Sequence, residues 1–361
     1  MSHCGWKKIT QIQSLKKGTI MSFKQIQPIP SAEKIQDVLP LPDDLKAKKE
    51  ERDAEIRAIF ERKSDKFLLV IGPCSAHNVD AVCEYVNRLA RLQEQVMDKL
   101  VLVPRIYTNK PRTTGEGYKG MAHQPDPEGM PDMVVGIKTI RQMQIRAFRE
   151  SHLTAADEML YPSNLPYVED LLSYIAVGAR SVENQNHRLT ISGVDVPAGM
   201  KNPTGGDLDV MFNAIYAAQI PHVFFHNGWE VGTSGNPLTH AVLRGMSYNG
   251  RSIPNYHYED LMHVAEEYLA RKLGNPTIIV DTNHNNSDKT FSEQPRIGLE
   301  VMRSRRHSAL LHNVVRGLMV ESYLEEGAQK PEEGIFGKSI TDPCLGWEDT
   351  EVFVKDLAGL V

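Results

Sequence analysis

The stretch Phe67-Leu68-Leu69-Val70-Ile71-Gly72-Pro73 decides the fold, because it has the pattern of a buried strand that ends abruptly. Five consecutive apolar residues favour a strand covered on both faces, and the Gly-Pro pair ends it. Residues 80–100 then carry apolar side chains at helical spacing and predict an amphipathic helix. A strand followed by a helix is the repeating unit of a parallel sheet.

The same unit recurs along the chain. Further strands are predicted at 101–106, 153–156, 176–180, 196–200, 222–225, 277–280 and 317–320. Further helices are predicted at 136–150, 209–218, 258–272 and 300–307. About eight such units match a closed barrel better than an open doubly wound sheet, and no glycine-rich nucleotide-binding motif follows any strand. The sequence therefore predicts an α/β fold, a (β/α)8 TIM barrel.

An N-terminal extension precedes the predicted barrel. Residues 22–45 contain four prolines and predict an extended arm. Residues 46–64 are rich in Lys, Glu, Arg and Ala, and the helical spacing of Ile56, Ile59 and Phe60 predicts a leading helix. We therefore expect residues 1–64 to form an arm and a leading helix, and residues 65–361 to form the catalytic barrel.

The composition excludes several classes of protein. The chain has 361 residues, 41% hydrophobic and 24% charged, and its net charge of -5 gives no electrostatic footprint for nucleic acid. No apolar run approaches the roughly 20 residues of a membrane helix. The first twenty residues lack the apolar core of a secretion signal, and Met21 is a possible second start. Four scattered cysteines, at positions 4, 74, 83 and 344, do not form a disulfide framework, so we expect a cytoplasmic protein.

In a TIM barrel, polar residues at the carboxyl ends of the strands converge on one mouth. Here such positions supply a thiol, an imidazole and two carboxylates, from Cys74, His284, Glu321 and Asp342. This ligand set suits a borderline divalent ion, Mn, Fe, Co or Zn, better than Mg or Ca. The residue types alone leave other interpretations open: a small buried cysteine, a hydrogen-bonded histidine and a glutamate paired with a barrel cation.

The same strand ends supply a set of cations: Arg105, Lys110, Arg112, Arg180, Lys201 and Arg244. Burying so many like charges is costly unless anions neutralise them, which indicates phosphorylated or carboxylated ligands. The stretch 105–114 is also compatible with a solvated basic loop. Arg180 and Arg244 could instead form ion pairs with barrel carboxylates.

Several motifs together resemble the class I family of 3-deoxy-D-arabino-heptulosonate 7-phosphate (DAHP) synthases of bacterial and fungal aromatic amino acid synthesis. They are Gly72-Pro73-Cys74-Ser75, Lys110-Pro111-Arg112-Thr113-Thr114, Gly178-Ala179-Arg180 with His187-Arg188, Lys201-Asn202, Val320-Glu321-Ser322, and Gly337 through Asp342 to Gly346-Trp347-Glu348-Asp349. The resemblance runs from about Phe23 to the C-terminus. It implies a metal-dependent barrel enzyme that condenses phosphoenolpyruvate with erythrose 4-phosphate and releases phosphate, the first step of the shikimate pathway.

The resemblance also implies roles for individual residues. Lys110, Glu158, Cys74 and His284 would be catalytic, with Glu158 orienting the water that attacks C2 of phosphoenolpyruvate and Lys110 donating a proton. The metal ligands would be Cys74, His284, Glu321 and Asp342. Substrate binding would fall to Arg105, Lys110, Arg112, Thr113, Gly178, Ala179, Arg180, Lys201 and Arg244. We expect a homodimer or homotetramer that binds neither nucleic acid nor membrane.

Two rival functions remain. The related 3-deoxy-D-manno-octulosonate 8-phosphate synthases share the barrel and the phosphoenolpyruvate half, but their sugar-phosphate loop differs from Lys-Pro-Arg-Thr-Thr. A non-catalytic regulatory paralogue would be expected to lose residues of the ring, and none of the named positions is lost.

Regulation is where the sequence departs from the resembled family, whose members are commonly inhibited by Phe, Tyr or Trp. The loop 161–166 lacks the family's usual Asp and Pro-Gln pattern, Asp195 replaces a small residue, and the segment 226–233 is shorter than the family's hairpin. We therefore expect weak, absent or altered feedback inhibition.

Overall fold

The computed structural model describes residues 23–361, and the chain divides into two compact units after Pro30. The described residues of the first unit, 23–30, form neither helix nor strand. Cys4 and the possible second start at Met21 lie outside the described residues. Among the described residues, no helix has both the length and the apolar character needed to cross a membrane.

The second unit is built around one sheet of eight parallel strands, which are buried along their whole length. In sheet order these are β2 (Leu100–Pro104), β1 (Phe67–Gly72), β12 (Val315–Glu321), β11 (Ile278–Asp281), β8 (Thr239–Leu243), β5 (Ala198–Lys201), β4 (Leu172–Val177) and β3 (Ala155–Glu158). The two edges meet through a parallel bridge between Arg105 and Ala156, where Ile106 N donates to Ala156 O at 2.8 Å. The predicted (β/α)8 barrel is therefore confirmed.

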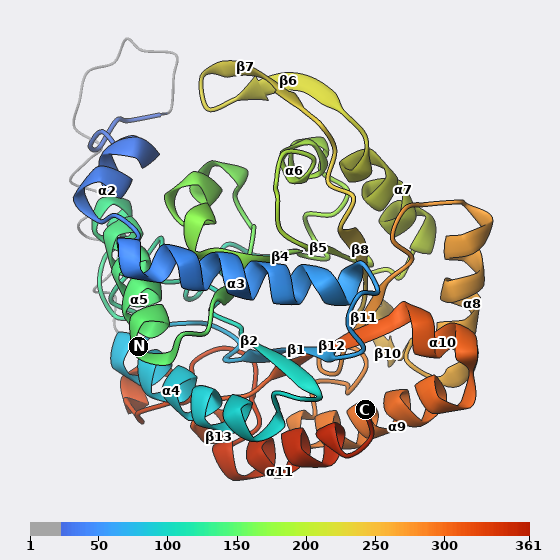
Figure 1. Ribbon diagram of the computed structural model, residues 1–361. Coiled ribbons are helices and arrows are strands. Elements are labelled where there is room, and N and C mark those ends of the chain that lie inside the picture. Colours follow the sequence, from blue (N-terminus) through green and yellow to red (C-terminus); the bar gives the residue numbers. More distant parts are fainter. Residues whose placement is uncertain (1–22) are drawn as a thin grey trace. The chain divides into compact units, whose positions relative to one another are not determined.

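Helices surround the sheet and connect successive strands (Figure 1). Several begin at the side-chain caps that the sequence supplies: Asn78, Asp132 and Asp207 each accept a backbone N–H of the first turn. The helices are α4 (Val79–Val96), α5 (Met133–Ser151), α6 (Gln185–Ile191), α7 (Leu208–Gln219), α8 (Tyr258–Ala270), α9 (Gln294–His307), α10 (Ala309–Val314) and α11 (Trp347–Ala358).

The leading helix, α3 (Asp43–Phe60), packs across the barrel at the end where the strands begin (Figure 1). Its Ile56, Ile59 and Phe60 join one apolar cluster with inward-facing strand residues. Arg52 Nη2 donates to Leu102 O at 2.9 Å and so ties the helix to β2. Because α3 closes this end of the barrel, the loops at the carboxyl ends of the strands are left to form a site.

The prediction of strand six was wrong. Residues 222–225 belong to an exposed antiparallel hairpin of β6 (His222–His226) and β7 (Trp229–Thr233), and β8 supplies the sixth barrel strand. The turn at Asn227 and Gly228 has positive φ values of 49° and 87°, as the two central residues of a tight hairpin require. The Asn-Gly pair is the local signal for this hairpin, and the apolar residues on both sides of it resemble those of a barrel strand.

Several other boundaries differ from the prediction, for example that of the leading helix, which covers Asp43–Phe60 rather than residues 46–64. The predicted extended arm contains α2 (Ala32–Val38), which begins at the cap Ser31 and buries Ile35. The fourth strand ends at Val177, so the segment 178–180 lies in the turn after it. The remaining elements are β9 (Met246–Tyr248), β10 (Arg251–Ile253), β13 (Glu325–Ala328), β14 (Lys338–Ser339), η2 (Pro162–Tyr167), η3 (Glu169–Leu171), η4 (Phe291–Glu293) and η5 (Pro331–Glu333).

Candidate active site

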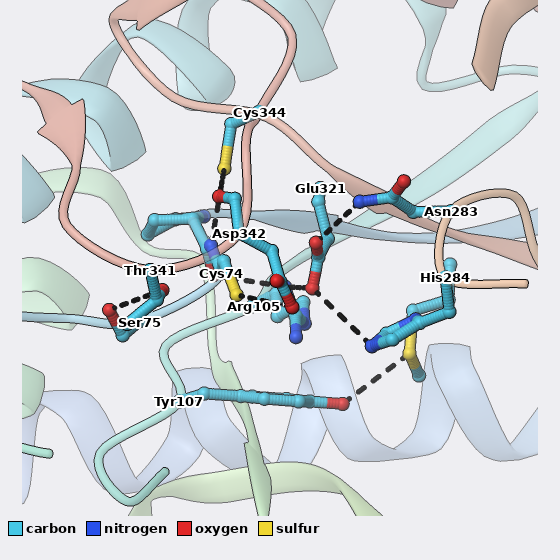
Figure 2. A network of polar contacts seen from close by, with 12 residues as sticks. Cys74, Ser75, Arg105, Tyr107, Asn283, His284, Glu321, Thr341, Asp342 and Cys344 are labelled. Carbon is cyan, nitrogen blue, oxygen red and sulfur yellow. Dashed lines mark hydrogen bonds and ion pairs between the residues drawn. The ribbon is translucent and has the colours of Figure 1, made fainter. Parts of the chain in front are cut away.

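Three of the four predicted metal ligands meet at the mouth of the barrel. Cys74 follows β1, Glu321 ends β12, and Asp342 lies in the loop before α11. One ligand atom from each lies within 4.8 Å of the others, and Cys74 Sγ is 3.7 Å from Asp342 Oδ2 (Figure 2). A soft thiolate and two carboxylates from three separate segments make a candidate metal centre.

Glu321 is held in place on both sides. Its Oε1 lies 2.8 Å from Arg105 Nη1, and its Oε2 accepts from Asn283 Nδ2 at 2.6 Å (Figure 2). Burial raises the pKa of this carboxyl, but the cationic neighbours Arg105 and His284 outweigh it and hold the pKa below its usual range. Within the described part of the chain, Oε1 receives no hydrogen bond of good geometry, which leaves a lone pair for another ligand.

The fourth predicted ligand, His284, lies beside the cluster rather than in it. Its Nε2 is 3.9 Å from Glu321 Oε1, and its Nδ1 is 2.9 Å from Asp281 Oδ2. Figure 2 shows the ring pointing toward Glu321. The backbone φ of His284 is 52°, a left-handed conformation that is uncommon outside glycine. The ring has a carboxylate beside Nδ1 and turns Nε2 toward a candidate ligand, an arrangement that fits a metal-binding histidine, whose second ring nitrogen is usually held by such an acceptor.

Lys110 is buried against the thiol. Its Nζ donates to Cys74 O at 2.6 Å and lies 3.0 Å from Cys74 Sγ. Burial lowers the pKa of this ammonium, but the neighbouring Cys74 and Glu321 outweigh burial and raise it. Burial, followed by the charge of Glu321, raises the pKa of the Cys74 thiol. The ammonium is therefore positioned to stabilise the thiolate form that a metal requires.

The predicted cations share one cavity with Asp342, at the edge of the candidate metal centre. Its lining includes Arg105, Lys110, Arg112, Glu158, Gly178, Ala179, Arg180, Lys201, Arg244, His284 and Asp342. Thr113 is outside the lining, but its Oγ1 accepts from Arg180 Nε at 3.1 Å. The cavity therefore collects the six predicted cations from four barrel strands and the loops that follow them.

Partners fix several of these cations. Lys201 Nζ donates to Asp281 Oδ2 at 2.9 Å, and Arg112 Nε donates to Tyr118 O at 2.8 Å. Arg244 Nη1 donates to the amide oxygen of Asn285 at 3.0 Å, and burial lowers the pKa of its guanidinium. Among the described residues, neither Arg180 nor Arg244 forms an ion pair with a carboxylate, so that alternative interpretation is not what the structure shows.

Gly178 lies directly against the end of the Glu158 side chain. A Cβ at this position would lie 2.0 Å from Glu158 Oε1. The Glu158 carboxylate therefore rests against the turn after β4, where the backbone of Gly178 and Ala179 faces the cavity. Any larger residue would displace the predicted water-orienting group.

Four residues that support the site, Lys289, Tyr107, Asp281 and Asn283, have no role in the prediction from sequence. Lys289 Nζ pairs with Asp342 Oδ1 at 2.9 Å, and the Tyr107 ring lies 3.8 Å beneath the Arg105 guanidinium. Asp281 and Asn283 hold His284 and Glu321, as described above. Tyr107 could have been found, because it follows Arg105 by two residues, the spacing that places two side chains on one face of an extended segment. Lys289 lies beyond its strand in an irregular loop, where no spacing rule places it.

A parallel barrel whose mouth combines clustered cations with a thiol and carboxylate centre defines a class: a TIM-barrel enzyme for anionic substrates, with a candidate metal site. The comparisons name the family within that class. The model of the DAHP synthetase I family matches residues 44–355. The chain belongs to this family.

Individual relatives agree. The chain is 39% identical over 315 residues to the Phe-sensitive phospho-2-dehydro-3-deoxyheptonate aldolase of Escherichia coli K12, covering 85% of this chain and 87% of that protein. It is 36% identical over 347 residues to the Tyr-sensitive enzyme of Salmonella typhimurium, covering 90% and 94%. A solved phospho-2-dehydro-3-deoxyheptonate aldolase from Francisella tularensis matches with a TM-score of 0.87 and 29% identity, over 94% of this chain and 98% of that one.

Proposed function

We propose that this protein is a 3-deoxy-7-phosphoheptulonate synthase, which condenses phosphoenolpyruvate with D-erythrose 4-phosphate and releases phosphate. The observation that carries the proposal is the single cavity in which six cations adjoin the Cys74, Glu321 and Asp342 cluster. Arg105 and Lys201 are paired with Glu321 and Asp281, but among the described residues no carboxylate forms an ion pair with Arg112, Arg180 or Arg244. Two phosphorylated substrates would supply the negative charge that these three cations lack.

The residues present fit a divalent metal. Cys74, Glu321 and Asp342 would hold it, and His284 would complete the set by approaching from beside Glu321. The thiol favours Mn, Fe, Co or Zn over Mg or Ca. When bound, the ion would supply Lewis-acid polarisation of the aldehyde carbonyl of erythrose 4-phosphate.

The cations divide between the two substrates. Arg105, Lys110, Arg180, Lys201 and Arg244, with the backbone of Gly178 and Ala179, would hold phosphoenolpyruvate. Arg112 and Thr113 would hold the phosphate of erythrose 4-phosphate. The 3.1 Å contact between Arg180 and Thr113 supports this division, because it brings the two groups side by side.

The chemical step then uses two buried side chains. C3 of phosphoenolpyruvate attacks the aldehyde carbon, and the developing alkoxide takes a proton from Lys110, whose raised pKa keeps it protonated. Glu158 orients a water that adds at C2. Phosphate leaves with cleavage of its C–O bond, so the electron pair of that bond departs with the phosphate.

The test is phosphate release from phosphoenolpyruvate with each of two sugar phosphates, with and without chelator. We expect turnover with erythrose 4-phosphate that chelator abolishes. Turnover with arabinose 5-phosphate but not with erythrose 4-phosphate would indicate an octulosonate 8-phosphate synthase instead. No turnover with either sugar phosphate would indicate a non-catalytic paralogue. We further propose a cytoplasmic homodimer or homotetramer, which fractionation and light scattering can test.

A further inference from the structure

The barrel has one weak seam, between β2 and β3. Every other pair of neighbouring strands is joined by a ladder of three or more paired residues, whereas these two are joined by the single bridge of Arg105 and Ala156. Strand β2 ends at Pro104, which has no N–H to donate. Lys110 lies in the loop after β2 and Glu158 lies at the end of β3, on the two sides of this seam. The positions of both proposed catalytic groups therefore depend on how these two segments are held together.

A side chain bridges the seam. The Asp157 carboxylate accepts three hydrogen bonds: Oδ1 from Thr108 N at 2.9 Å and from Glu158 N at 2.7 Å, and Oδ2 from Thr108 Oγ1 at 2.5 Å. Asp157 is 5% exposed and Thr108 is fully buried. Two of the three bonds come from Thr108, in the loop after β2. The Asp157 carboxylate therefore joins this loop to β3 where backbone pairing between the two strands is missing.

We propose that Asp157 is a positioning residue, which with Thr108 fixes the loop of Lys110 relative to the strand of Glu158. Glu158 is the next residue in the chain, and its own N–H is one of the three donors. Lys110 lies two residues beyond Thr108, whose carbonyl is held from the other side by Ala122 N at 3.1 Å. The proposal rests on the proposed function, because it assigns these two groups to its chemical step.

The site limits the expected effect on phosphoenolpyruvate binding. Lys201 and Arg244 come from other strands, and their partners Asp281 and Asn285 lie outside the loop that Asp157 holds. Loss of the Asp157 bonds should therefore misplace the proton donor and the water-orienting carboxylate while most contacts to phosphoenolpyruvate remain. A shift of about 1 Å in a catalytic group can cost on the order of a hundredfold in rate.

The experiment compares Asp157→Ala, Thr108→Val and Thr108→Ser with the wild type, assayed for phosphate release at saturating Mn²⁺. We expect Asp157→Ala to lower kcat by about tenfold or more, with KM for phosphoenolpyruvate within about threefold of wild type. Thr108→Val, which removes one bond and keeps the carboxylate, should show a smaller loss of kcat. Thr108→Ser should restore it because the hydroxyl returns.

The matched control is Gln93→Ala. Gln93 is also a buried side chain bonded to β2, through Leu100 O at 2.8 Å and Leu102 N at 2.7 Å, but at the end of the strand away from the mouth. The Gln93→Ala substitution should lower the melting temperature and leave kcat near that of the wild type. This separates positioning from a general loss of stability.

The outcomes distinguish the two proposals. If the wild type is active and both Asp157→Ala and Thr108→Val keep a kcat within twofold of it, the positioning role is overturned and the proposed function stands. A loss of kcat in Gln93→Ala equal to that in Asp157→Ala overturns the positioning role as well. Should Asp157→Ala not fold, the Thr108 pair decides: valine and serine with the same kcat overturn the proposal, and a loss with valine that serine restores supports it. A wild type without turnover overturns the proposed function and this inference with it.

Discussion

The Lys110 ammonium lies 3.0 Å from the Cys74 thiol sulfur and donates to the carbonyl oxygen of the same residue at 2.6 Å. The proposed proton donor and a proposed metal ligand are therefore held together by two contacts. The chemistry of one cannot be changed without affecting the environment of the other.

Lys110→Arg tests the chemical role of this ammonium. Arginine keeps the charge but is a planar, weakly acidic donor that does not fit the compact position against Cys74. We expect kcat to fall by about a hundredfold or more and affinity for phosphoenolpyruvate by a much smaller factor. Steady-state kinetics and direct binding of phosphoenolpyruvate measure the two separately. Equal losses would reduce Lys110 to a binding residue.

Cys74→Ser tests the metal centre. The thiol is the only soft ligand in the proposed set, so its loss should weaken metal binding and turnover together. Titration of the apoprotein with Mn²⁺ or Zn²⁺, followed calorimetrically, gives the affinity without relying on activity. Cys83→Ser is the matched control, because Cys83 is a buried cysteine on α4 outside the cluster. A variant that stays fully active in chelator would refute the ligand assignment.

Oxidation should inactivate the enzyme through Cys74 and Cys344. Both thiols are buried, and Cys74 N donates to Cys344 Sγ at 3.4 Å. Peroxide would take two electrons from the thiols, forming a disulfide and water, and dithiothreitol with metal should restore activity. Mass spectrometry of the unreduced peptide identifies the bond. Loss that reductant does not reverse, or the same reversible loss in Cys344→Ser, would argue against this disulfide.

The Asp157 carboxyl gives a prediction for pH. Burial raises its pKa from 3.8 to about 7, a shift that its bonds from Thr108 and Glu158 N oppose and the Glu158 charge assists. A carboxyl with a raised folded-state pKa stabilises the fold fully below its unfolded pKa, and this contribution is lost as the pH rises through about 7. At about 1.36 kcal/mol per pKa unit, this shift changes the free energy of unfolding by at most about 4 kcal/mol.

The measurement is the melting temperature of wild type and Asp157→Asn between pH 4.5 and 8. Glu158, whose charge contributes to the raised pKa of Asp157, is unchanged in the variant. The difference between the two proteins should favour wild type at low pH and shrink as the pH rises. A difference that grows with pH would show that the three hydrogen bonds dominate over burial.

Feedback inhibition is expected to be weak, absent or altered. Asp195 is exposed, and its carbonyl accepts from Arg57 Nη2 at 2.6 Å. Packing an apolar amino acid side chain against this carboxylate would desolvate it, at roughly a few kcal/mol. Turnover should therefore change little with each aromatic amino acid at millimolar concentration. Inhibition by Phe, Tyr or Trp at micromolar levels would refute this prediction.

The sequence by itself determined the alternation of strands and helices. Apolar runs such as residues 67–71 and the polar residues at their carboxyl ends are local patterns, and a parallel barrel places all such ends at one mouth. That is why the ring of Cys74, Glu321 and the cations could be predicted without coordinates. The Asn227-Gly228 turn is also a local signal, which indicates a hairpin in place of a barrel strand.

The tertiary structure alone decided which groups touch. The contact between Lys289 and Asp342, the position of His284 beside the cluster, and the Asp157 bridge to Thr108 join segments that are far apart in the chain or irregular in shape. Side-chain periodicity carries no information about such contacts, because it reports which face a residue occupies and not what lies across from it. Only the closure of the barrel brings these atoms within bonding distance.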